Sequence, residues 1–266
     1  MPSQCNIPFM CLILLAYQCH SKYPLIIAAN RDEYYRRPTQ NVHWWPDRPD
    51  VLAGKDLHSG GTWMGISRQG RFAAVTNIRE GKLSAGDYLS RGQLTLKYLT
   101  DQINDTDFHQ FLQNSRQNFR GYNLLFGTRH KLQHFSNRSQ TFTELKPGIY
   151  GLSNANLDSP WPKVEKGKAE LDQLLSAVTL KHEDLFQILA NKAIAADKYL
   201  PDTGIGLERE RQLSAIRICG DDYGTRSSST LTIDRHNKIT FHEKERAPEQ
   251  GPIKKFSFKI HSTDQY

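Results

Sequence analysis

The amino-acid sequence predicts an α+β fold in which antiparallel sheets are covered by helices. Apolar, partly β-branched segments occur in pairs joined by short turns, a pattern typical of β-hairpins. Segments with helical spacing also occur in pairs, between the hairpins along the chain. Paired helices do not fit the strand–helix alternation of a parallel sheet. Two antiparallel sheets packed between two layers of helices satisfy this order.

Four hairpins account for the predicted strands. The first joins two buried strands, residues 11–19 and 24–30, across a turn at residues 20–22. The others are expected at residues 60–77, 122–137 and 230–243. The run GGTW at the start of the second hairpin predicts a turn followed by a core aromatic residue, or alternatively the wall of a ligand cleft.

The segments between the hairpins are predicted to be one loop and four helices. Residues 31–50 are polar and rich in proline, which favours a loop. Trp44 and Trp45 within it are either core anchors or a lid over an apolar ligand. Apolar spacing predicts helices at residues 89–103, 108–119, 160–178 and 183–196. Ser159 and Pro160 suit the N-cap and the first position of the third helix.

The domain organisation is expected to be simple. The chain has 266 residues, enough to bury a substantial core. No internal repeat and no linker divides it, so a single domain is expected at residues 10–250. Residues 251–266 are charged and only weakly strand-like, and they are expected to form a C-terminal tail.

Composition excludes several classes of function. The net charge of +7 is spread over short, distant clusters, which does not predict specific nucleic-acid binding. Four cysteines do not make a disulfide scaffold and favour a reducing, cytoplasmic location. No apolar run reaches the ~18 residues that a transmembrane helix needs. Residues 7–17 have the length of a signal-peptide core but lack its basic flank and its cleavage site.

Metal and nucleotide sites are not expected either. His130 and His134 are four residues apart, but in a predicted hairpin they do not share one face as they would on a helix. The sequence contains no CxxC, P-loop or G-x-G-x-x-G motif. We therefore expect that no cofactor is required and that any partner is a small molecule. The oligomeric state does not follow from the sequence.

The first hairpin brings a thiol close to a group of charges. With the turn centred near residue 21 or 22, Cys11 lies opposite residues 31 to 33. These residues are Arg31, Asp32 and Glu33, in the string NRDE. A nearby cation favours the thiolate, which is the reactive form of cysteine. Cys11 is therefore a candidate nucleophile.

A nucleophilic Cys11 needs a base, and the sequence offers no obvious histidine for that role. If the mature chain began at Cys11, its own α-amino group could accept the proton, with Asp32 orienting it. Met10 directly precedes Cys11, so translation starts at Met10 and residues 1–9 are an upstream over-extension, or residues 1–10 are a propeptide. The alternative is that Cys11 is a buried cysteine of a core strand.

Six strings in this order resemble the NRDE family, also called the transport and Golgi organisation protein 2 family. They are MCLILLAY, AANRDEYYRRPT, GGTWMGIS, VTN at residues 75–77, YGLSNANLDSPWPKV and YGTRSSSTLTID. The matches run from Met10 to about residue 245. The resemblance implies an N-terminal-nucleophile hydrolase fold, which is a four-layer αββα sandwich. Family members typically begin with Met-Cys, which favours Met10 as the start.

The resemblance also implies roles for particular residues. In penicillin-acylase and bile-salt-hydrolase relatives of the fold, an N-terminal cysteine attacks an amide carbon, flanked by an arginine and an aspartate. These roles map by position onto Cys11, Arg31 and Asp32. Asparagines line the oxyanion hole in that fold, and the candidates here are Asn77 and Asn154. Arg226, in the string YGTR, is expected to face the site.

Two functions follow as hypotheses from this resemblance. The first is a cysteine N-terminal-nucleophile hydrolase acting on an amide or acyl substrate. The second is a non-enzymatic protein that binds and carries haem, acyl lipid or acyl-coenzyme A, because family members are linked to haem handling, acyl metabolism and Golgi organisation and secretion. In the second case haem is a cargo and Cys11 performs no chemistry.

Overall fold

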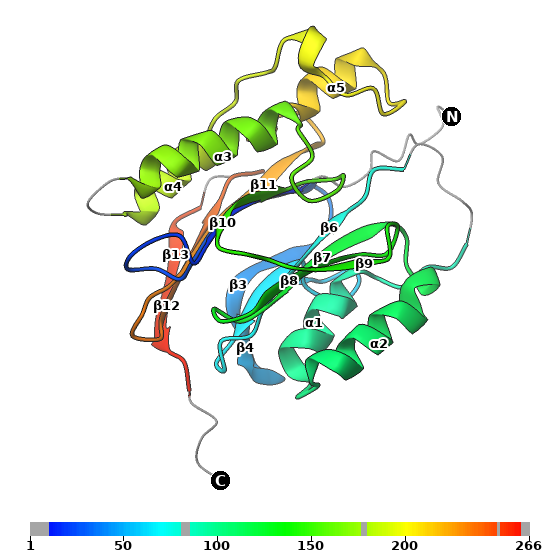
Figure 1. Ribbon diagram of the computed structural model, residues 1–266. Helices are drawn as coiled ribbons and strands as arrows, with labels where there is room; N and C mark the ends of the chain where they lie inside the picture. Colours follow the sequence, from blue (N-terminus) through cyan, green and yellow to red (C-terminus); the bar gives the residue numbers. More distant parts are fainter. Residues whose placement is uncertain (1–10, 81–85, 177–179, 249–250, 262–266) are drawn as a thin grey trace.

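The structure, a computed structural model, describes residues 11–80, 86–176, 180–248 and 251–261. Two antiparallel sheets lie in the middle, and helices cover both outer faces (Figure 1). This arrangement confirms the predicted four-layer αββα sandwich. The expectations about Met10 and about residues 1–9 lie outside the described residues.

Six strands of the described chain form the first sheet, in the order β10-β1-β2-β11-β12-β13. Their bounds are Cys11–Tyr17 for β1, Leu25–Tyr34 for β2, Gly148–Leu152 for β10, Tyr223–Ile233 for β11, Lys238–Glu245 for β12 and Ile253–Lys259 for β13. β1 and β2 form the first predicted hairpin, with Cys11 directly opposite Arg31. The predicted register is confirmed.

Seven strands form the second sheet, and each pairs with its neighbour in the chain, from β3 to β9. Their bounds are Thr39–Trp45 for β3, Arg48–Asp56 for β4, Met64–Ser67 for β5, Phe72–Asn77 for β6, Tyr122–Gly127 for β7, Leu132–Ser136 for β8 and Thr141–Glu144 for β9. The predicted hairpins at residues 60–77 and 122–137 are β5–β6 and β7–β8.

Helices close the two outer faces of the sandwich. Helices α1 (Gly92–Thr100) and α2 (Asp105–Ser115) pack on the seven-stranded sheet. Helices α3 (Pro162–Leu175) and α4 (His182–Leu189) pack on the six-stranded sheet. A further helix, α5 (Leu207–Leu213), follows α4 in the chain. None of the helices in the described residues is long and apolar enough to cross a membrane.

The two faces of β1 enter different parts of the core. Ile13 and Leu15 belong to the apolar cluster between the two sheets. Leu12 and Leu14 belong to the cluster under α3 and α4, since successive side chains of a strand point to opposite faces. Gly167 lets α3 approach closely, because a Cβ atom there would lie 2.7 Å from the Leu14 side chain. The same alternation governs residues 30–33 at the end of β2.

The prediction of a loop at residues 31–50 was wrong. β2 continues to Tyr34, and β3 and β4 occupy most of the remainder. Trp45 is fully buried, and its Nε1 donates a hydrogen bond to the Ala53 carbonyl oxygen at 3.0 Å. Trp44 packs against Phe258. The two tryptophans are core anchors, and the lid interpretation is wrong.

The C-terminal segment expected to be a tail contains strand β13, paired along its length with β12. Its partly buried Phe256 and Phe258 pack against the cluster between the sheets and alternate with exposed polar residues, while Ile253 packs against the cluster under α3 and α4. The predicted helices are present but shorter. α3 begins at Pro162 with Trp161 as N-cap, and α4 ends at Leu189. Helix α5 and strands β9 and β10 were not predicted.

Candidate active site

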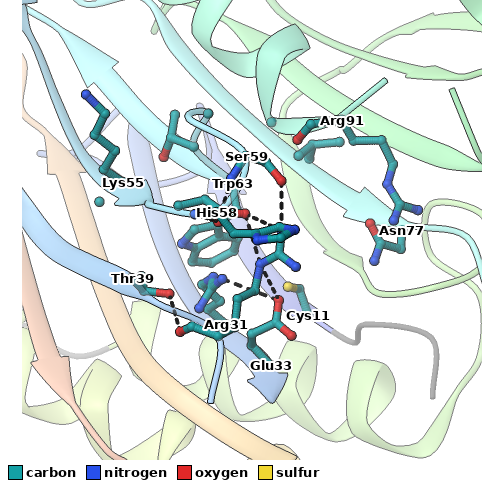
Figure 2. Close-up of a pocket in the computed structure, with 18 of the residues that line it drawn as sticks. Cys11, Arg31, Glu33, Thr39, Lys55, His58, Ser59, Trp63, Asn77 and Arg91 are labelled. Carbon is teal, nitrogen blue, oxygen red and sulfur yellow. Dashed lines mark hydrogen bonds and ion pairs between the residues drawn. The ribbon is translucent and has the colours of Figure 1, made fainter. Parts of the chain in front are cut away.

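A cavity of about 710 Å³ opens between the two sheets, where β1 begins and β2 ends (Figure 2). Its lining includes Cys11, Arg31, Asp32, Asn77 and Arg226 from the predicted set, together with Glu33. Thr62 and Trp63 also line it, so the GGTW run forms a cleft wall. The cavity thus collects residues from both sheets that lie far apart in the sequence. Its volume is in the range of small-molecule sites.

Cys11 and Arg31 lie opposite each other on β1 and β2 and share the cavity with Glu33. Arg31 Nη2 lies 3.4 Å from Glu33 Oε2, and Arg37 Nε lies 3.5 Å from the same oxygen. Arg31 Nη1 is buried and has no hydrogen-bond partner among the described residues. A buried guanidinium with an unused donor at a cavity is suited to bind an anionic or carbonyl oxygen.

The Cys11 thiol is only 8% exposed, at the inner end of the cavity. Burial raises its pKa to about 12, and the negative charge of Asp32 adds to that shift, while Arg31 opposes it. The thiol is therefore neutral at physiological pH and reacts only if a base removes its proton. The described residues provide no histidine in the cavity lining except His58, which is on the exposed rim.

Asn30 is on the opposite face of β2, under the helices, and has a structural role. It is fully buried, and its Nδ2 donates hydrogen bonds to the carbonyl oxygens of Leu189 at 2.9 Å and Ile216 at 2.8 Å. Its Oδ1 accepts a hydrogen bond from Ser228 Oγ at 2.7 Å. Asn30 thus ties β2 to the end of α4 and to the segment that precedes β11.

Asp32 shares that helix-covered face and meets a buried lysine. Its Oδ1 accepts a hydrogen bond from Thr225 Oγ1 at 2.6 Å. Lys163, in the first turn of α3, is 2% exposed. Asp32 Oδ2 and Lys163 Nζ both lack a hydrogen-bond partner within the described residues. Burial raises the pKa of Asp32 and lowers that of Lys163, and the attraction between the two charges opposes both shifts.

The two candidate oxyanion residues are in contact but differ in position. Asn77 ends β6 and lines the cavity. Asn154 is buried behind it, and its Nδ2 donates a hydrogen bond to the Asn77 carbonyl oxygen at 2.9 Å. The Ser153 hydroxyl lies 2.9 Å from the Cys11 carbonyl oxygen and 3.0 Å from Asn154 Oδ1. Ser153 and Asn154 therefore connect the start of β1 to the end of β6.

Arg226 lines the cavity from β11, but its guanidinium is already engaged. Its Nη1 lies within hydrogen-bond distance of three carbonyl oxygens, those of Tyr34, Tyr35 and Arg37, at 2.7 to 3.1 Å. Tyr34 is the last residue of β2, and Tyr35 and Arg37 belong to the turn that follows it; Arg37 lines the cavity. In this arrangement Arg226 shapes the wall of the cavity.

Among the charged residues near the site that the sequence did not indicate are Lys163, Arg91 and Arg120. Lys163 belongs to the string SPWPKV, at the start of a predicted helix, where a lysine is normally exposed. Arg91 and Arg120 lie in separate segments that flank α1 and α2. No local pattern in the sequence links them to Cys11, so no signal was available for these two.

The architecture and the site together define a class of protein. The solved structure of penicillin V acylase from Agrobacterium tumefaciens superposes with a TM-score of 0.53, covering 94% of this chain and 86% of the acylase. The sequences are 9% identical, so the likeness concerns the fold. With two antiparallel sheets between helix layers, the chain has the fold of the N-terminal-nucleophile hydrolases.

The family follows from sequence comparison. The family model described as Transport and Golgi organisation 2 matches residues 10–248. The Transport and Golgi organization protein 2 homolog of Bos taurus is 32% identical over 263 residues, covering 88% of this chain and 92% of the relative. The Homo sapiens homolog is 30% identical over 256 residues, with the same coverage. The chain belongs to the Transport and Golgi organisation 2 family.

Proposed function

We propose that this protein is a cysteine N-terminal-nucleophile hydrolase that cleaves an amide or acyl bond once Cys11 is its first residue. The observation that carries the proposal is the Cys11 thiol, directly opposite Arg31 at the inner end of a ligand-sized cavity. The fold supports the same proposal, because it is shared with a penicillin V acylase. The raised pKa of the Cys11 thiol supports the need for a base, which a free α-amine would supply.

In the proposed reaction, Cys11 Sγ attacks the substrate carbonyl carbon while the α-amine of Cys11 takes the thiol proton. The carbonyl π electrons move to oxygen, and the Asn77 side chain donates a hydrogen bond to that oxyanion. The bond to the leaving group then breaks, and the α-ammonium gives its proton to the leaving atom. This yields a thioester on Cys11. Water, deprotonated by the α-amine, attacks the thioester, releases the acid and restores the thiol.

The surrounding residues have positioning roles in this proposal. Arg31 Nη1 is available to bind the substrate near the reacting carbonyl. Asn154 holds the Asn77 carbonyl oxygen, which fixes the end of β6 next to Cys11. Asp32 and Lys163 are both buried, and the charge of each acts on the other. Arg226 keeps the turn after β2 in its place in the cavity wall.

The test compares two forms of the chain that differ only in residues 1–10. Both are incubated with a panel of N-acyl amides of increasing acyl length, and mass spectrometry locates the acyl adduct. We expect the adduct on the peptide that begins with Cys11, and only when residues 1–10 are absent. Cys11→Ser in the shorter form should lower turnover by about 10³-fold or more, whereas Cys19→Ala, at an exposed free thiol, should not.

Acylation that is equally fast in the chain with residues 1–10, or that occurs at Cys19 or Cys219, contradicts the proposed mechanism. A chain that retains residues before Cys11 in its native host also contradicts it. Peptide mapping of the isolated protein decides this point directly.

The neutral, buried Cys11 thiol favours one further candidate, a protein that binds an acyl compound or haem without chemistry. In that case the cavity holds the cargo and Cys11 is part of its wall. Spectroscopic titration with haemin and with an acyl-coenzyme A tests this. Stoichiometric binding that survives Cys11→Ala, together with no turnover in either chain form, favours the binding function. Absence of binding to both probes removes its support.

A further inference from the structure

One end of the cavity carries two arginines that sequence reasoning did not connect. Arg91 immediately precedes α1, and Arg120 precedes β7, and both line the cavity. Figure 2 shows the Arg91 guanidinium pointing toward Asn77, on the side of the cavity where Cys11 lies. Burial, followed by repulsion from Arg120, lowers the pKa of Arg91 to about 10. Two positive charges are thus held near each other beside the candidate nucleophile.

These two charges have no acidic partner of their own in the described part of the chain. Arg91 Nη1 donates a hydrogen bond to the Gly121 carbonyl oxygen at 3.0 Å, and the Arg120 guanidinium lies over the Tyr88 ring. Neither has a carboxylate oxygen within 4 Å among the described residues. Glu80, whose charge acts on Arg91, is itself ion-paired with Arg138.

The other cavity wall is different in this respect. Arg37 Nη2 lies 2.6 Å from Asp56 Oδ2, and Lys55 Nζ lies 3.6 Å from Asp47 Oδ1. The cations of that wall are therefore neutralised by carboxylates of the protein. Holding two guanidinium groups together without a directly paired carboxylate costs free energy, which a bound anion would recover. The difference between the walls indicates where the negative group of a ligand fits.

We propose that Arg91 and Arg120 form a subsite for an anionic group of the ligand, next to the carbonyl that faces Cys11. This subsite deepens the proposed function, on which it rests, by naming the substrate class as an amide or thioester whose leaving portion carries a carboxylate or phosphate. Guanidinium groups suit both anions because their planar donors match two oxygens at once.

The rest of the cavity fits this class of ligand. Figure 2 shows Asn77 between the Arg91 guanidinium and Cys11. A carbonyl at Cys11 would then have its leaving portion directed to Arg91. Trp63 and Val75 also line the cavity and provide apolar surface for an acyl chain. The volume of about 710 Å³ accommodates an acyl chain together with a small polar group.

The test is an equilibrium binding measurement on the full chain carrying Cys11→Ser, so that no turnover interferes. Three probes are titrated by calorimetry: N-octanoylglycine, its neutral counterpart N-octanoylglycinamide, and octyl phosphate. We expect Arg91→Gln and Arg120→Gln each to weaken binding of an anionic probe by about tenfold or more, because each removes a charged hydrogen-bond donor. Binding of the neutral amide should change less than about twofold. Retained binding of the neutral amide also shows that the variants remain folded.

Lys55→Gln is the matched control, since it removes the same charge from the other wall of the cavity. It should leave the affinity for N-octanoylglycine within about twofold. The anion whose binding falls more in the arginine variants identifies the ligand as a carboxylate or a phosphate ester.

Three results would overturn the subsite: equal losses for the anionic and neutral probes, an equal loss in Lys55→Gln, or no binding of either anionic probe at millimolar concentration. The measurement needs neither a free Cys11 amine nor catalysis. Failure of the hydrolase mechanism, seen as absence of an acyl adduct on Cys11, is therefore distinguishable from failure of the subsite.

Discussion

The four residues 30–33 at the end of β2 alternate between two faces of the strand, and the residues on the two faces have different roles. On the helix-covered face, Asn30 satisfies two backbone carbonyl oxygens and Asp32 is held by Thr225 and by the charge of Lys163. On the cavity face, Arg31 and Glu33 form an ion pair that leaves one guanidinium nitrogen without a partner. Asn30 on the helix-covered face is fully engaged in holding layers together, whereas Arg31 on the cavity face retains unused binding capacity.

This difference separates structural from functional residues within one motif. A buried polar group that satisfies several backbone groups stabilises the fold, since its removal leaves those groups without partners. A buried cation with an unused donor costs stability and is retained where a ligand completes its bonds. Substitutions on the helix-covered face should therefore change folding, and those on the cavity face should change binding.

The largest expected effect on stability comes from Asn30→Ala. It leaves the carbonyl oxygens of Leu189 and Ile216 buried without donors, which should lower the free energy of unfolding by about 3 kcal/mol. Arg31→Gln should lower it by about 1 kcal/mol, because Glu33 keeps Arg37 as its partner and glutamine retains a hydrogen-bond donor. Urea denaturation of both variants checks this. A loss for Arg31→Gln as large as that for Asn30→Ala would remove the distinction between the faces.

Acid should weaken the helix-covered face through His182, whose Nδ1 lies 2.7 Å from Thr230 Oγ1. Burial, followed by repulsion from His242, lowers the pKa of His182 to about 4 from its ordinary 6.5. As the pH falls below 6.5, the unfolded chain therefore binds a proton that the folded chain does not. The contribution of neutral His182 is complete above pH 6.5 and is lost as the pH falls toward 4.

The loss should amount to about 2 kcal/mol, given the partial exposure of the ring. Urea denaturation at pH 7.5 and pH 4.5 measures it, and His182→Gln should reduce the difference between the two pH values by that amount. His236→Gln, at an exposed position, is the control. An unchanged pH dependence in His182→Gln would show that its imidazole does not titrate as argued.

The smallest expected effect concerns the buried pair of Asp32 and Lys163. Lys163→Met should lower the free energy of unfolding at pH 7.5 by about 1–2 kcal/mol, because Asp32, whose pKa burial already raises, loses its neighbouring cation and takes up a proton. Combining it with Asp32→Asn should recover most of that loss, since neither charge then remains buried alone. A double-mutant cycle in urea gives the coupling energy. Strictly additive losses would mean that the two charges do not interact.

Local patterns in the sequence were sufficient for the first hairpin. Its apolar strands and polar turn defined both elements, and the turn position set the register that brings Cys11 opposite Arg31. The helix pairs were also recognisable from their spacing, although their ends were not, because terminal turns depend on capping and packing. The edge strands β3 and β13 were missed because they mix polar and apolar residues. The interior strand β4 was missed because it begins with polar residues, and Pro38 and Pro49 favour a loop.

Only two kinds of site residue could be predicted: those on the first hairpin, and those in strings that resemble the family. Asn77, Asn154 and Arg226 came from resemblance to a family, and the structure brings them to the cavity or next to it. It also assigns different surroundings to Arg31 and Asp32, which the sequence had grouped together, because neighbouring side chains on a strand point to opposite faces.

By itself, the sequence determined the αββα class, the pairing of β1 with β2 and the position of Cys11 at their open end, because these depend on periodicity and on one short turn. Only the tertiary structure decided that Lys163 is buried on the same side of the sheet as Asp32, and that Arg91 and Arg120 both line the cavity. Those juxtapositions arise when α3 docks on one sheet and α1 on the other. Local periodicity carries no information about which charged side chains such docking encloses.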